Sequence, residues 1–167
     1  ESSGFITRFD MYIWKSVCKT LAAWQDKGCK LVPISINVSM IDITNIDVPQ
    51  YLSMLTEQYH ISPEYLPVEI TESVFAESNT IVKNTITRFH KKGFYVLMDD
   101  FGSGYSSLNV LKDANVDYLK LDMKFMQIDA KNKGKGIQIL KSMNCNYGQG
   151  FYFHRPMSVE AAEELIQ

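Results

Sequence analysis

The stretch FYVLMDDFGSGYSSL, residues 94–108, decides the fold of this 167-residue chain. Its first five residues, 94–98, form an apolar run that predicts a buried strand and leads directly into Asp99 and Asp100. Two adjacent carboxylates at the end of a buried strand are costly unless a positive charge holds them. A divalent cation is one answer, since Mg2+ and Mn2+ take carboxylate oxygens. A helix N-terminal cap followed by a glycine turn is the other, and the stretch alone does not decide between them.

Outward from this stretch, helical and strand patterns alternate along the chain. Apolar residues at helical spacing predict helices, and short apolar runs rich in β-branched residues predict strands. The predicted helices cover residues 7–27, 47–60, 79–92 and 106–112, with a last helix after an N-cap at Ser158; the predicted strands cover 31–38, 66–71, 94–98, 116–121 and 149–153. Such alternation indicates an α/β fold with a parallel sheet covered by helices.

Polar residues interrupt the apolar strands near their carboxyl ends: Asn37, Glu69, Asp99, Lys120 and Gln149. In a (β/α)8 barrel these ends converge on one mouth, and several strands contribute catalytic groups. A doubly wound sheet would place its site mainly at one switch point. Five separate strand ends therefore favour a TIM-like (β/α)8 barrel. A full barrel takes about 250 residues, so we expect this chain to carry it incompletely.

Two further segments add charge to the predicted mouth. Glu69 shares a strand face with Thr71, and Glu72 lies just beyond the strand, where it either supports a site or simply begins the following turn. Lys120 lies inside an apolar strand, where a lysine needs an acidic partner or a function. It is interpreted either as a group that orients or activates water or as half of a structural salt bridge.

Composition excludes several other classes. With 17 basic and 19 acidic residues the chain has no Lys/Arg excess, so a DNA or RNA polymer is not expected as a partner. Its three cysteines show no CxxC spacing, which is typical of a reduced compartment. His60, His90 and His154 show no pairing pattern, so nucleophilic catalysis is not expected. No stretch approaches the roughly 18 to 20 apolar residues of a membrane span. We expect a cytoplasmic domain of a longer parent protein, and this expectation includes the cytoplasmic part of a membrane-anchored one.

Six segments, taken in order, resemble the EAL-domain phosphodiesterases that hydrolyse cyclic di-GMP. Residues 98–108 are close to the family's D-D-F-G-T-G-Y-S-S-L, with Ser103 in place of Thr. The other segments are residues 1–6 (E-x-x-G-x-I), 35–39 (V-N-x-S), 69–73 (E-x-T-E-S), 116–125 (V-D-x-L-K-I-D-x-x-F) and 149–156 (Q-G-Y-x-F-x-x-P). The resemblance covers essentially the whole chain.

The resemblance implies a TIM-like barrel whose mouth holds two Mg2+ or Mn2+ ions, with Ca2+ expected to be inhibitory. It implies metal-assisted hydrolysis of one phosphodiester bond of cyclic di-GMP to give the linear dinucleotide, additional signalling domains in the parent protein, and a homodimer through about residues 106–111. The implied metal ligands are Asn37, Glu69, Asp99 and Asp100, with Lys120 holding and activating the attacking water, Glu72 steadying the loop after Asp100, and Gln149 lining the substrate site.

Two family features are absent from the sequence: the Glu-x-Leu-x-Arg signature of the first strand, and a later E-G-V-E strand that supplies another glutamate. Between Phe125 and Gln149 there is room for barely one helix. Residues 1–167 are therefore interpreted as a partial EAL domain with a sequence gap between about 126 and 137. Either a complete domain exists in the parent protein, or the domain is shortened. The second hypothesis is a non-catalytic domain that binds the dinucleotide or a partner protein; an unrelated metal-dependent barrel enzyme is the third.

Overall fold

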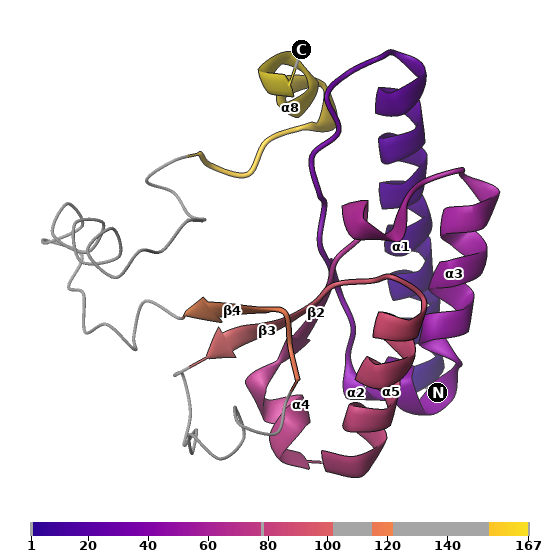
Figure 1. Cartoon of the computed structure of the whole chain (residues 1–167), viewed down its shortest axis with the longest axis vertical. Helices are drawn as coiled ribbons and strands as arrows, with labels where there is room; N and C mark the ends of the chain where they lie inside the picture. Colours follow the sequence, from indigo (N-terminus) through magenta and orange to yellow (C-terminus); the bar gives the residue numbers. More distant parts are fainter. Residues whose placement is uncertain (1, 78, 102–114, 122–153, 167) are drawn as a thin grey trace, which may run out of the picture.

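A computed structural model describes residues 2–77, 79–101, 115–121 and 154–166. Four parallel strands form one sheet in the order β1-β2-β3-β4, with helices packed on one side (Figure 1). The strands are β1 (Ile36–Asn37), β2 (Val68–Thr71), β3 (Val96–Phe101) and β4 (Tyr118–Leu121). The helices are α1 (Ser2–Asp26), α2 (Met40–Asn45), α3 (Val48–Gln58), α4 (Glu72–Glu77), α5 (Asn79–Lys91) and α8 (Val159–Ile166), with a 3-10 turn η1 (Pro63–Tyr65).

The strand order agrees with the predicted barrel. Each described strand pairs in parallel with the next one along the chain. A doubly wound sheet reverses its order at a switch point, and no reversal occurs among these four strands. The described residues therefore form one arc of an α/β barrel.

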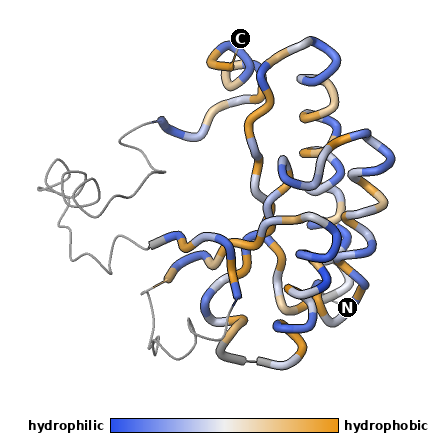
Figure 2. The backbone as a smooth tube through the Cα atoms, in the orientation of Figure 1, coloured by the Kyte–Doolittle hydropathy of each residue, from blue (hydrophilic) through white to orange (hydrophobic). Residues whose placement is uncertain are grey.

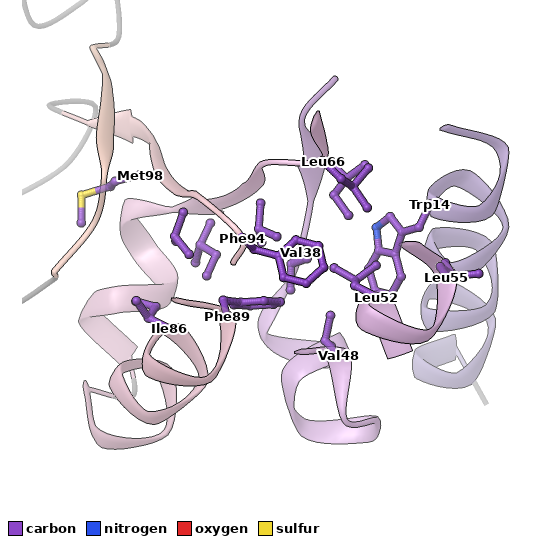
Figure 3. Packing of buried hydrophobic residues seen from close by; sticks show 14 of the residues in the cluster. Trp14, Val38, Val48, Leu52, Leu55, Leu66, Ile86, Phe89, Phe94 and Met98 are labelled. Carbon is purple, nitrogen blue, oxygen red and sulfur yellow. The ribbon is translucent and has the colours of Figure 1, made fainter. Parts of the chain in front are cut away.

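The core lies between this arc and the helices. One face of the strands is buried through alternating residues, which are Ile36, Val38, Val68, Ile70, Val96 and Met98. Trp14 of α1, Leu52 of α3 and Phe89 of α5 pack toward that face (Figure 3). Hydrophobic and hydrophilic residues alternate along α1 and α5, as expected of helices with one buried face (Figure 2). The opposite strand face is thus the one that carries polar groups.

The first predicted strand, 31–38, is shorter in the structure, where only Ile36–Asn37 has strand geometry. The backbone still follows its neighbour, because the N–H of Ile34 donates to Tyr65 O at 3.0 Å. Pro67 accepts from Ile36 but has no N–H to return, which interrupts the reciprocal ladder. The physical cause of the short strand is therefore a proline on the partner segment.

Other elements agree with the predictions or extend them. The first helix begins earlier than expected, at Ser2, and the last helix is confirmed, with Ala161 N donating to Ser158 Oγ at 3.3 Å. Two short helices were not predicted, α2 and α4, and Glu72 begins α4 rather than a turn. The predicted helix 106–112 and strand 149–153 lie outside the described residues. Within the described part of the chain, no helix has the length and apolar character needed to cross a membrane.

Candidate functional site

The strand face that none of the described helices covers carries the candidate site. In the sheet register Asn37 pairs with Glu69, and Thr71 pairs with Asp99. These residues alternate with the buried apolar residues along each strand, so they share the other face. In a barrel this face points inward, which places the predicted polar residues on the interior side near the carboxyl ends of the strands.

Lys120 joins two of the predicted carboxylates. Its Nζ atom lies 2.8 Å from Glu69 Oε2 and 3.2 Å from Asp99 Oδ1. The side chain of Glu69 is 7% exposed, whereas those of Asp99 and Lys120 are 22% and 26% exposed. A carboxylate this far from water is stable only when it is paired. The three residues therefore form one charge cluster, with two negative charges and one positive charge, drawn from β2, β3 and β4.

The electrostatics of this cluster determine the state of the lysine. Burial by itself lowers the pKa of Lys120, but hydrogen bonds to Glu69 and Asp99 and their charges outweigh burial, so the net pKa is raised. Lys120 is therefore an ammonium group at neutral pH. It can donate hydrogen bonds and stabilise negative charge, and it is not a general base under these conditions.

A β-bulge explains how two adjacent aspartates can both avoid the helix-covered face. Met98 pairs with Leu119 and Phe101 with Leu121. Between these two pairs β3 advances by three residues and β4 by only two, so β3 contains one extra residue. Asp100 takes the left-handed backbone conformation, with φ of 56°. Because the extra residue resets the alternation, Phe101 returns to the buried face while Asp99 and Asp100 remain accessible. The N–H of Asp100 also donates to Asp99 Oδ1 at 2.9 Å, which fixes that carboxylate.

The other predicted residues occupy supporting positions. Asn37 is held through its backbone, because its carbonyl accepts a 3.0 Å hydrogen bond from the indole Nε1 of Trp14. Glu72 is buried at the first turn of α4, which packs against β2 and β3. Trp14 was not predicted as part of the site, although a buried indole N–H requires an acceptor and could have signalled it. Gln149 and residues 106–111 lie outside the described residues.

The donor set fits a metal ion only in part. Among the described residues no three His, Cys, Asp or Glu side chains are grouped so that they could hold a metal, so Asp100 does not complete a three-carboxylate site with Glu69 and Asp99. Two carboxylates nevertheless converge on one cation, the Lys120 ammonium, and Asn37 lies in register beside Glu69. Carboxylate and amide oxygens are ligands for hard divalent cations. The residues present therefore fit part of a divalent-metal ligand set.

The expectation that the histidines are unpaired was wrong for His90. Its Nε2 atom lies 2.9 Å from Asp117 Oδ2, and Asn115 Nδ2 lies 3.4 Å from its Nδ1. No local pattern predicts this pairing, because His90 and Asp117 are 27 residues apart and meet only where the end of α5 lies beside the start of β4. Among the described residues, the side chains of this pair contact the backbone N–H of Val96 and the amide of Asn115 rather than a serine or cysteine nucleophile, so the pair indicates a structural role.

Comparisons with known sequences agree with this geometry. The model of the family described as "EAL domain" matches residues 1–139. The signaling protein YkoW of Bacillus subtilis is 28% identical over 193 residues, which cover 99% of this chain and 24% of that protein. The cyclic di-GMP phosphodiesterase PdeR of Escherichia coli is 29% identical over 192 residues, which cover 98% of this chain and 29% of that protein. This chain thus spans about a quarter of the length of these relatives.

Solved structures show the same fold. The EAL domain of Mycobacterium smegmatis DcpA has a TM-score of 0.81 at 23% identity, over 96% of this chain and 84% of that one. The PaMucR phosphodiesterase in complex with c-di-GMP has a TM-score of 0.82 at 23% identity, over 97% and 76%. Klebsiella pneumoniae BlrP1 in a manganese/cy-diGMP complex has a TM-score of 0.62 at 19% identity, over 83% and 36%. The predicted TIM-like barrel is confirmed, and this chain belongs to the EAL domain family.

Proposed function

We propose that this chain carries out metal-dependent hydrolysis of cyclic di-GMP to the linear dinucleotide, as part of second-messenger signalling. The observation that carries the proposal is the convergence of Glu69, Asp99 and Lys120 from three neighbouring strands on the interior face of the barrel. Membership of the EAL family, the phosphodiesterase relative PdeR and the dinucleotide complex of PaMucR support it.

The proposed metal ligands are Asn37, Glu69, Asp99 and Asp100, which would hold two Mg2+ or Mn2+ ions. Their oxygen donors suit these cations, and the solved relative BlrP1 contains manganese. When bound, such ions lower the pKa of coordinated water and offset the charge of phosphoryl oxygens. The bulge at Asp100 matters here, since it keeps both aspartates off the helix-covered face.

The protein's own groups have separate roles in this proposal. Lys120, held as an ammonium, donates hydrogen bonds that orient the attacking water and stabilise negative charge on the phosphoryl group. Glu69 and Asp99 hold the lysine in place before substrate arrives. Glu72 supports the segment after Asp100 from the buried start of α4, and Gln149 lines the substrate site.

We also propose that residues 1–167 form a partial domain, with a gap between about 126 and 137. The alignment with YkoW covers 193 positions, 26 more than the 167 residues of this chain. YkoW therefore contains residues that have no counterpart in this chain. Deleting a barrel strand would leave exposed apolar edges and unpaired backbone groups, so we favour a complete domain within a longer cytoplasmic signalling protein.

A non-catalytic receptor for cyclic di-GMP is the alternative. The absence of an E-G-V-E segment between Phe125 and Gln149 favours it, because the sequence then lacks one glutamate of the family's site. The absence of a three-ligand group among the described residues favours it too. A receptor would bind the dinucleotide without producing linear product.

Asp99→Asn tests the proposed hydrolysis. The change keeps the size of the side chain but removes its charge. We expect at least a loss of about 100-fold in Mn2+-dependent turnover, the typical effect of removing one group that stabilises charge in the transition state. Glu57→Gln is the matched control, because Glu57 is an exposed carboxylate on α3 far from this face. Full activity of Asp99→Asn would contradict the metal assignment.

A further inference from the structure

Asp117 links β3, α5 and the start of β4. It directly precedes β4, at the amino-terminal end of the strand, whereas the site lies near the carboxyl ends of the strands. Its Oδ2 atom accepts a 2.7 Å hydrogen bond from the backbone N–H of Val96 and lies 2.9 Å from His90 Nε2. Its own N–H donates to the carbonyl of Val96 at 2.8 Å. Asp117 is thus bound to the first residue of β3 through both backbone and side chain, and to the last turn of α5 through His90.

The side chain replaces a hydrogen bond that the backbone cannot supply. Asn115, two residues before Asp117, has a φ of 45°, so the chain turns there and enters the sheet only at Tyr118. The N–H of Val96 would otherwise lack an acceptor on the β4 side, and a carboxylate oxygen takes that position. The pairing of β3 with β4 therefore starts at Asp117.

This starting point determines where Lys120 falls. β4 has only four residues, and its pairing with β3 changes register across the bulge between Met98 and Phe101. A slip of one residue would turn Lys120 to the opposite face of the sheet. Lys120 is only three residues after Asp117. Anchoring the start of β4 at Asp117 therefore fixes which face Lys120 occupies, and so places its ammonium between Glu69 and Asp99.

The histidine ring adds two contacts to the anchor, at Nε2 and at Nδ1. If Nε2 carries the proton and donates to Asp117, then Nδ1 accepts from the amide of Asn115, and both of these ring contacts are satisfied. The same arrangement would accept an asparagine at position 117, because an amide oxygen has two lone pairs for Val96 and His90. Alanine at this position has no acceptor for either donor.

We propose that Asp117, held by His90, is a positioning residue for Lys120: it fixes the register of β4 on β3 and so places the ammonium between the two carboxylates. The part of this proposal that concerns turnover rests on the proposed hydrolysis. The part that concerns the position of Lys120 does not, and it can be measured in unfolding experiments without substrate.

The first measurement is the coupling between Lys120 and Glu69, obtained from unfolding of Lys120→Met, Glu69→Gln and the double variant. We expect the coupling, expressed as a ratio of unfolding constants, to fall at least about fivefold in an Asp117→Ala background and to stay within about twofold in Asp117→Asn. Val82→Ala is the control, because Val82 is fully buried on the same helix as His90 but lies eight residues before it, about 12 Å along the helix axis.

The second measurement is turnover of cyclic di-GMP with Mn2+. We expect kcat to fall at least about tenfold in Asp117→Ala with little change in KM, recovery in Asp117→Asn, and no change in Val82→Ala at a temperature where all variants are folded. If Asp117→Ala does not fold, His90→Phe removes one donor alone and should lower the coupling in the same direction.

The outcomes separate the two proposals. Unchanged Lys120–Glu69 coupling in folded Asp117→Ala, or in His90→Phe when the former does not fold, overturns the positioning role whatever the turnover. Reduced coupling with recovery in Asp117→Asn supports it, even in a protein that hydrolyses nothing. Loss of coupling in Asp117→Asn and Val82→Ala as well would also overturn it, since the effect would then follow stability alone.

Discussion

Replacing Lys120 with methionine removes the ammonium from the charge cluster while keeping a side chain of similar length. Glu69, whose side chain is 7% exposed, then loses its cation and faces the neighbouring charge of Asp99. Removing one partner of a fully buried ion pair costs about 3–5 kcal/mol. Because Lys120 is about a quarter exposed, solvent screens part of the interaction, and we expect a loss of about 2–3 kcal/mol in the free energy of unfolding.

Urea denaturation followed by circular dichroism measures this loss, and a double-mutant cycle assigns it. In a Glu69→Gln background the buried charge is gone, so Lys120→Met should cost only about 1 kcal/mol or less. If the cluster also binds a divalent cation, millimolar Mn2+ should stabilise Lys120→Met more than the parent protein, because the cation replaces the lost charge. Equal costs of Lys120→Met in the two backgrounds would refute the ion pair as the source of the stability.

Two further predictions concern the helices beside the site. Trp14→Phe should lower the free energy of unfolding by about 1 kcal/mol more than Trp24→Phe does. The Trp14 indole donates to Asn37 O, whereas the buried Trp24 indole has no hydrogen-bond partner among the described residues. Equal urea midpoints of the two variants would contradict this. Burial, and then the charge of Asp42, raise the pKa of Asp10 above its usual 3.8. A carboxyl group whose pKa is raised in the folded protein stabilises the fold at pH values below its unfolded pKa. That stability is lost as the pH rises through the pKa of the folded protein. Asp10→Asn should therefore be more stable than the parent at pH 7, by a few tenths of a kcal/mol, with the gain disappearing by about pH 3 on thermal scans; a gain of equal size at both pH values would contradict it.

Much of the arrangement could be predicted from residue pattern alone. Apolar runs such as residues 94–98 indicate strands, because strands of a parallel sheet are covered on both faces and therefore have almost continuously apolar sequences. The polar residues Glu69 and Asp99 end such runs, and parallel strands bring these ends to one edge, so their proximity follows from the fold class. Glu69 and Thr71 lie on the same face because side chains two residues apart in a strand point in the same direction.

The rest depends on contacts that the pattern does not contain. Strict alternation would put Asp99 and Asp100 on opposite faces, and only the register of β4 reveals the bulge that prevents this. The shortening of β1 depends on Pro67, which lies on a different segment from the strand it shortens. The pair His90 and Asp117 forms because α5 ends beside the start of β4, a tertiary relation between residues that are distant in sequence.

Incubation of the purified protein with cyclic di-GMP, followed by chromatography of the products, tests the proposed hydrolysis most directly. We expect linear dinucleotide in the presence of Mg2+ or Mn2+ and none with Ca2+ or with the metal removed by chelation. Binding of cyclic di-GMP by calorimetry, without linear product in any of these cations, would contradict hydrolysis and identify the chain as a receptor.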